Sequence, residues 1–236
     1  MEKTFEQYCM ENGLEALLWQ WDNEKNLPLR PDQVRYGTQK KAWWKCERGH
    51  RWQAVVYARV TGNGCPYCAQ KRALAGYNDL ATKFPEIAAQ WDAEKNDTLT
   101  PQDVLAYSNK KVWWRCGQGH SYVAEISKRT RQHSGCPYCA NKLVLPSFND
   151  LASKRPDVAK QWHPSMNAGL MPKQVTCGSK RSVWWQCGYG HAWKAVIYSR
   201  TAKRAAGCPV CAKEMAGRSY RQPARRQQSR TAAAQE

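Results

Sequence analysis

The chain has 236 residues, and its 37 Lys and Arg outnumber its 19 Asp and Glu, so its formal net charge is +18 at pH 7. This composition argues against an acidic or membrane-buried protein, because no apolar run approaches the roughly 18 residues that a membrane helix needs. The polar, acidic N-terminus does not resemble a signal peptide, which indicates a cytoplasmic protein. In a reducing compartment, eleven cysteines that occur mostly in close pairs are better interpreted as metal ligands than as disulfides.

One unit occurs three times along the chain. The motif Trp-Trp-x-Cys-x-x-Gly-His begins at Trp43, Trp113 and Trp184, so the copies are offset by 70 and 71 residues. Each copy closes on Gly-Cys-Pro-x-Cys-Ala. Because internal repeats decide the architecture of a chain, we predict three units, followed by a basic disordered tail. The predicted boundaries are residues 1–72, 73–143 and 144–213 for the units and residues 214–236 for the tail.

Short helices are predicted at the start of each unit. In the second and third units, the Asn-Asp pairs that begin at Asn78 and Asn149 can cap a helix by accepting its free backbone N–H groups. Pro85 and Pro156 then begin a second short helix. The first unit opens with a different sequence of helical spacing at residues 5–18. Each unit continues with Gln-Trp and an asparagine five residues later, at Asn26, Asn96 and Asn167.

Each unit also carries a Cys-x3-His pair and a Cys-x2-Cys pair, which are separated by 14, 15 or 16 residues. Three thiolates and one imidazole form a closed four-ligand set that suits tetrahedral zinc. We therefore predict that the chain binds three Zn²⁺ ions. The ligands are Cys46, His50, Cys65 and Cys68 in the first unit, Cys116, His120, Cys136 and Cys139 in the second, and Cys187, His191, Cys208 and Cys211 in the third.

The order of these elements indicates the fold. A glycine precedes each histidine, which suits a tight knuckle with positive φ. The alternating stretch after His50 is typical of a strand, and the variable length of the segment before Cys65 indicates a hairpin. Proline inside the second cysteine pair favours the first turn of a helix. We predict a small α+β fold of three tandem treble-clef zinc fingers, each a zinc knuckle, a β-hairpin and a C-terminal helix preceded by short helices.

The cysteines also admit other interpretations. Cys-Pro-Tyr-Cys resembles a redox pair, but a redox site is expected once and without a Cys-x3-His pair upstream. A disulfide framework requires an oxidising compartment. Cys9 and Cys177 recur in no other unit and are predicted to be small apolar residues. His133 and His163 also lack counterparts and are predicted to be solvated.

Basic residues recur in register. Two precede each double Trp, and an arginine follows each predicted metal histidine by nine residues, where we expect the end of the first hairpin strand. Zinc binding by nine thiolates lowers the formal charge to about +15, so the surplus survives the metal. We predict that these positions form a repeated basic edge that contacts a polyanionic backbone, although any one of them could be only a solvated surface residue. The positions are Lys40, Lys41, Arg59, Lys110, Lys111, Arg129, Lys180, Arg181 and Arg200.

The ordered motif set resembles a known family. Trp-Trp-x-Cys-x-x-Gly-His, Gly-Cys-Pro-Tyr-Cys, Asn-Asp-Leu-Ala and Trp-x4-Asn-x2-Leu together are similar to the tandem treble-clef repeats labelled a probable zinc-ribbon domain in bacterial and viral proteins. The resemblance covers nearly all of residues 14–213. It implies a zinc-stabilised module that binds nucleic acid, joined in some members to a nuclease domain. The residues before the upstream tryptophans, often acidic in the family, are Gln20, Gln90 and Gln161 here.

These observations lead to three functional hypotheses. The first is a non-enzymatic protein that binds nucleic acid, DNA rather than RNA, with no membrane or small-molecule substrate. The second is a zinc-stabilised scaffold for protein–protein interaction, in which the charge serves solubility. The third, less favoured, is a metal-dependent nuclease or its DNA-recognition subunit, which needs a further catalytic histidine and an open metal position.

Overall fold

The computed structural model describes residues 3–219. Its contacts divide the chain into two units, Met1–Ser134 and Gly135–Glu236. The three-unit boundaries drawn from the sequence remain a prediction, and the numbered repeats below refer to them. No helix within residues 3–219 is long and apolar enough to cross a membrane.

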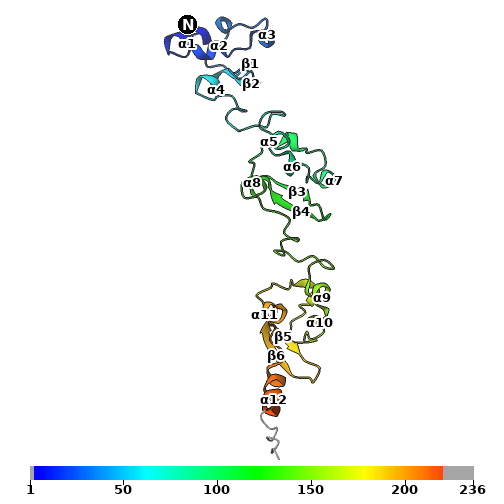
Figure 1. The fold of residues 1–236 in the computed structure, drawn as a ribbon. Helices are drawn as coiled ribbons and strands as arrows, with labels where there is room; N and C mark the ends of the chain where they lie inside the picture. The colour runs from blue at the N-terminus through cyan, green and yellow to red at the C-terminus, as the bar shows by residue number, and fades with distance from the viewer. Residues whose placement is uncertain (1–2, 220–236) are drawn as a thin grey trace, which may run out of the picture. The chain divides into compact units, whose positions relative to one another are not determined.

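Each repeat is built from short helices that lead into a two-stranded antiparallel sheet (Figure 1). The elements of the first repeat are α1 (Phe5–Glu11), α2 (Glu15–Trp19), α3 (Asn23–Asn26), η1 (Pro31–Gln33), β1 (Lys41–Lys45), β2 (Arg51–Val55) and α4 (Val56–Val60). Those of the second are α5 (Leu80–Lys83), α6 (Pro85–Ala88), α7 (Ala93–Asn96), η2 (Pro101–Asp103), β3 (Lys111–Arg115), β4 (Ser121–Glu125) and α8 (Ile126–Thr130).

The third repeat follows the same plan. Its elements are α9 (Leu151–Lys154), α10 (Pro156–Ala159), η3 (Pro172–Gln174), β5 (Ser182–Gln186), β6 (Ala192–Val196), α11 (Ile197–Thr201) and α12 (Pro209–Ser219). Helix α12 continues six residues into the tail that was predicted to be disordered. The rest of that prediction, for residues 220–236, lies outside the described residues.

The helix starts predicted for the second and third repeats are confirmed. Asp79 and Asp150 cap α5 and α9 by accepting hydrogen bonds from backbone N–H groups three residues later. Pro85 and Pro156 occupy the first position of α6 and α10, where a missing N–H costs nothing. In the first repeat, Thr4 replaces the Asn-Asp pair and forms a capping box at α1.

The hairpin differs from the sequence expectation. β1 pairs with β2 so that Trp44 lies opposite Trp52, and the segment from Cys46 to His50 is therefore the turn of the hairpin itself. The predicted second hairpin strand between His50 and Cys65 is wrong, because that segment holds β2 and then α4. The pairing strand comes instead from the double-Trp segment, whose alternating burial places Trp44 inside and Trp43 outside.

Tryptophan dominates the core of each repeat. Trp44, Trp114 and Trp185 are fully buried, and each indole N–H donates to a carbonyl of the opposite strand at 3.0–3.1 Å. The upstream tryptophans meet them edge to face with ring centroids 5.4–5.6 Å apart. Edge-to-face contacts hold the two large indole rings in one orientation, so a pair of tryptophans forms a well-defined core in each small repeat.

The side-chain amide of each repeated asparagine pairs with the backbone of the first hairpin strand, as a neighbouring strand would. The Asn26 side chain accepts from the Trp43 N–H at 2.7 Å and donates to the Trp43 carbonyl at 2.8 Å. Asn96 and Asn167 make the same two bonds to Trp113 and Trp184. The asparagine of the Trp-x4-Asn motif thus satisfies backbone groups on the outer edge of the hairpin.

The turn at Cys-Pro-x-Cys also differs between repeats. In the first repeat the chain makes one helical turn and leaves it at Gln70, whose φ is +54°. The buried Asn78 side chain then donates to the carbonyls of Tyr67 and Arg72 at 3.0 Å. Asn149 repeats this arrangement after the second cysteine pair. A helix follows only the third pair, because the asparagine bonds take over carbonyls that a longer helix needs.

We expect Asn26→Ala to destabilise the first repeat by about 1–3 kcal/mol, because it leaves the Trp43 N–H without its partner and removes one of the two donors to the Trp43 carbonyl. Chemical denaturation of the zinc-loaded chain measures this loss. Asn23→Ala, an exposed position on the same helix α3, is the matched control. Equal stability of the two variants would contradict the assigned role of Asn26.

Candidate metal centres

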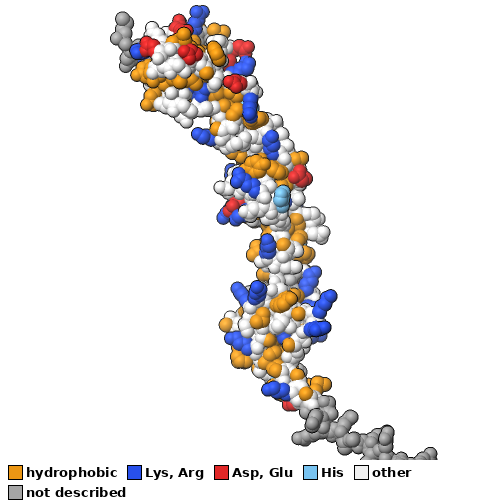
Figure 2. Space-filling view, turned by 60° about the vertical axis from the view of Figure 1, so that its left-hand side comes forward, with side chains coloured by type: hydrophobic (Ala, Val, Ile, Leu, Met, Phe, Trp, Pro, Cys, Tyr) orange, Lys and Arg blue, Asp and Glu red, His pale blue; other side chains and the backbone are white. Residues whose placement is uncertain are grey.

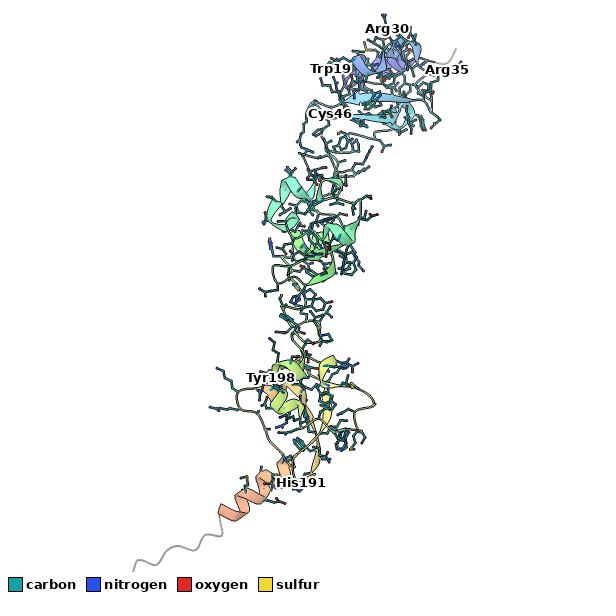
Figure 3. All side chains as sticks on the ribbon, turned by 90° about the vertical axis from the view of Figure 1, so that its right-hand side faces the viewer. Trp19, Arg30, Arg35, Cys46, His191 and Tyr198 are labelled. Atoms are coloured by element: carbon teal, nitrogen blue, oxygen red, sulfur yellow. The ribbon has the colours of Figure 1, made fainter. Side chains whose placement is uncertain are left out.

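Four ligand atoms gather at the hairpin turn of each repeat. In each of the three predicted ligand sets, the cysteine Sγ atoms and one histidine nitrogen all lie within 4.8 Å of one another. Cys46, which Figure 3 labels, and His50 come from the two ends of the β1–β2 turn. Cys65 and Cys68 come from the loop and turn that follow α4. The structure thus brings together all twelve residues that the sequence predicts as ligands.

The knuckle geometry explains this convergence. Gly49, Gly119 and Gly190 have φ values of +81°, +79° and +85°, which confirms the prediction of a left-handed residue before each histidine. The backbone N–H of Cys46 donates to the His50 carbonyl at 3.0 Å and that of Gly49 to the Cys46 carbonyl at 2.8 Å. These bonds close the turn and direct both ligand side chains to one point.

The distances between ligand atoms fit a zinc tetrahedron. Zinc–ligand bond lengths require tetrahedral edges of about 3.8 Å between sulfurs and about 3.5 Å between sulfur and nitrogen. Cys46 and Cys68 Sγ are 3.9 Å apart, and His50 Nδ1 lies 3.3 Å from Cys68 Sγ and 3.7 Å from Cys65 Sγ. In the third repeat the corresponding edges are 3.4–3.8 Å. The three sites are therefore of the Cys3His type, and each suits one zinc ion bound through Nδ1.

Hydrogen bonds within the knuckle favour its thiolate. Burial opposes ionisation of Cys46, but backbone N–H groups of His50 and Arg48 and the neighbouring thiols outweigh it, so the pKa of Cys46 lies below its usual value. Burial and the neighbouring thiols raise the pKa of Cys68 to about 11. Zinc must therefore displace protons from its ligands, and its affinity is expected to fall as the pH falls.

The predicted role of three of the basic residues is wrong. Arg59, Arg129 and Arg200 are only 3–5% exposed, so they do not form a surface edge. Each lies on the short helix after the hairpin, α4, α8 or α11, rather than at the end of a strand. The reason is that this helix turns back over the core tryptophans and carries the guanidinium inward.

Each buried arginine is held by the same set of partners. The Arg59 guanidinium donates to the backbone carbonyl of Asn63 and to Gln20 Oε1. It lies 5.0 Å from the ring centroid of Trp44 and 5.2 Å from that of Trp52. Arg129 bonds to Ser134 and Gln90, and Arg200 bonds to Ala206 and Gln161, with the same pairing of core rings.

Two of these buried arginines, Arg59 and Arg200, interact electrostatically with thiolates of their metal sites. Zinc with three thiolates and a neutral imidazole carries a single formal negative charge. Burial lowers the pKa of Arg59, and the thiolates of Cys65 and Cys46 act in the opposite direction. The thiolate of Cys208 does the same for Arg200. A hollow beside the first site is lined by Leu17, Gln20, Cys46, Glu47, Arg48, Arg59, Gly64, Cys65 and Cys68.

The glutamine partners were missed as site residues, although the sequence holds a signal for them. Gln20, Gln90 and Gln161 directly precede the upstream tryptophans, and each precedes its arginine by the same 39 residues. The glutamine recurs in register in all three repeats, as the arginine does. The other six predicted basic residues are exposed.

The remaining cysteines and histidines are not part of the metal sites. Cys9 is fully buried in the core of the first repeat, and burial with nearby Glu15 raises its pKa to about 11. Cys177 packs against the core of the third repeat. His133 is exposed, as predicted, whereas His163 is half-buried and its Nδ1 accepts from two backbone N–H groups at 3.3 Å.

Comparison with known proteins agrees with this geometry. A family model described as a probable treble clef zinc finger domain matches residues 17–71, 87–142 and 158–214. The matches cover most of the chain, and the chain therefore belongs to this family. A search of curated proteins found no matching relative.

We expect the folded chain to carry three zinc ions, counted by native mass spectrometry. A structural zinc supplies on the order of 10 kcal/mol of apparent folding free energy, so a strong chelator should abolish the circular dichroism of the repeats. A metal-free chain with an unchanged spectrum would refute the assignment.

The charge-balancing role of Arg59 has its own test. Arg59→Met keeps the long side chain and removes the charge, and we expect it to weaken zinc binding at the first site by roughly 10–100-fold. Chelator competition followed by native mass spectrometry should show one ion lost before the other two. Arg59→Lys should retain part of the affinity, and Arg30→Met, at an exposed position of the same repeat, should retain all of it. Identical zinc loss from the Arg59→Met and Arg30→Met variants would exclude a specific role for Arg59.

Proposed function

We propose that the chain is a non-enzymatic nucleic-acid-binding protein whose three zinc-stabilised repeats contact the phosphate backbone. The observation that carries this proposal is a set of six exposed basic residues at the entrance to the three hairpins, here called the basic entrance set. It consists of Lys40, Lys41, Lys110, Lys111, Lys180 and Arg181.

Backbone bonds place one member of this set at an equivalent position in each repeat. The carbonyls of Lys40, Lys110 and Arg181 accept from the first residue of α4, α8 and α11 at 3.0–3.1 Å. Arg181 is therefore the counterpart of Lys40, which accounts for the shift by one residue that the sequence shows in the third repeat. Lys180 lies one position earlier in the chain.

The charge of the set is available to a partner. Within residues 3–219, the ion pairs shorter than 4.0 Å use other basic residues, among them Arg51, Arg115 and Arg155. Figure 2 shows Lys and Arg side chains projecting from both flanks of the third repeat, in the lower part of the view. An uncompensated cationic surface on a chain of this net charge attracts polyanions.

Catalysis has no support in the arrangement of the sites. Each site uses four protein ligands, whereas a catalytic zinc keeps one position for water or substrate. The histidine that recurs in every repeat is one of those ligands. We therefore propose a structural role for the metal.

A protein-interaction scaffold is a second candidate. Trp19 on α2 and Tyr189 in the third knuckle are each 84% exposed, and such aromatic side chains are common anchors of protein interfaces. These residues do not recur in the other repeats, so a partner of this kind would contact single repeats.

Changing the basic entrance set to glutamine should weaken binding to nucleic acid and reduce the dependence of log K on log salt by up to about 4–5. The control changes six other exposed lysines to glutamine and removes the same charge: Lys25, Lys83, Lys95, Lys154, Lys160 and Lys173. Fluorescence anisotropy over a salt series measures both. Equal losses would mean that only the total charge matters, and salt-independent binding would contradict the proposal.

A further inference from the structure

Two tyrosines lie beside the basic entrance set and outside the metal sites. Tyr57 and Tyr198 occupy the second position of α4 and α11 and are 46% and 59% exposed. Their backbone N–H groups donate to the carbonyls of Thr38 and Ser179, at 3.2 and 3.0 Å. Thr38 stands two residues before Lys40, and Ser179 stands two residues before Arg181. Each tyrosine is therefore fixed next to a cation of the entrance set.

The two rings differ from other tyrosines of the chain in having an open face. Tyr36 stacks on Tyr8 with centroids 4.2 Å apart, and Tyr77 lies 4.1 Å from the imidazole of His50. Within residues 3–219, the rings of Tyr57 and Tyr198 make no aromatic or cation–π contact. Both rings are therefore available to a partner.

The location of these rings separates them from the zinc sites. Strands β5 and β6 place the knuckle at one end and the start of α11 at the other, since Ser182 pairs with Val196. Figure 3 accordingly shows His191 and Tyr198 at opposite ends of the third repeat. A ligand on Tyr198 would therefore leave the metal ligands untouched.

We infer that Tyr57 and Tyr198 are stacking sites for unpaired bases, and that the preferred partner is single-stranded nucleic acid. This inference rests on the proposed function and narrows it. Stacking requires a base with an open face, which a single strand offers and an intact duplex does not. The adjacent Lys40 and Arg181 contact the phosphates on either side of the stacked base.

The second repeat provides an internal control. Its equivalent position is Ser127, whose N–H donates to the Ser108 carbonyl at 2.8 Å. The Ser127 hydroxyl donates to Asn109 Oδ1 at 2.9 Å, so this repeat offers a cation without a stacking ring. The nearby Tyr107 is already engaged by Phe84 and Arg131.

The test compares the zinc-loaded full chain with its variants by fluorescence anisotropy. The probes are an oligothymidine of about 40 nucleotides, several times the length that one small module covers, a duplex of equal length and an oligouridine. The wild-type chain should bind the single strands more tightly than the duplex. The comparison of oligothymidine with oligouridine tells whether the chain prefers single-stranded DNA or single-stranded RNA. Either preference supports the inference.

Tyr57→Ala and Tyr198→Ala should each weaken single-strand binding by about tenfold and leave the salt slope unchanged, because they remove stacking and no phosphate contact. Tyr57→Phe and Tyr198→Phe should retain affinity, since the ring remains. Ser127→Tyr should increase affinity by a similar factor.

Two outcomes would overturn the inference and leave the proposed function standing. These are duplex binding as tight as single-strand binding, or alanine variants that bind single strands like the wild type. Failure of the chain to bind any of the three probes would overturn the proposed function as well.

Discussion

A tetrahedron of three sulfurs and one nitrogen joins the hairpin turn of each repeat to its C-terminal cysteine pair. Two ligands lie at the hairpin turn, and the other two begin 15 residues after His50 in the first repeat. A closed Cys3His site leaves a negative charge inside a small core, and such a charge is tolerated only when it is paired. In the first repeat, buried Arg59 is influenced by the thiolates of Cys65 and Cys46, and it bonds to the loop that presents the second cysteine pair. Metal, arginine and tryptophan core therefore depend on one another.

The burial of three recurring arginines changes which basic residues can contact a partner at the surface. Three arginines that recur in register are buried against the core tryptophans, so they do not offer their charge at the surface. The recurring charge that remains for a partner is the basic entrance set, at the end of each hairpin opposite the knuckle. A rigid, metal-closed half of each repeat thus supports a separate surface that can contact a ligand. Tethering three such surfaces raises the effective concentration of each for a long polyanion.

The sequence predicted the ligands well because metal coordination imposes spacing that repetition makes visible. The left-handed glycine before His50 and the helix starts at Pro85 and Pro156 were equally readable, since each follows from local backbone chemistry. The burial of Arg59 could not be predicted from the sequence in this way. A basic residue repeated in register looks the same whether it faces solvent or the core. The 39-residue separation from Gln20 to Arg59 does not distinguish the two cases, because the whole segment has the same length in all three repeats. The pairing of the hairpin was missed because two neighbouring segments both alternate, and the tryptophan core decides between them.

Zinc K-edge X-ray absorption of the purified, zinc-loaded chain tests the central claim most directly. Three identical Cys3His sites predict an average shell of three sulfurs at about 2.3 Å and one nitrogen at about 2.0 Å, with no oxygen neighbour. A four-sulfur shell, or a shell containing water oxygen, would contradict the closed site on which the charge balance with the buried arginines depends.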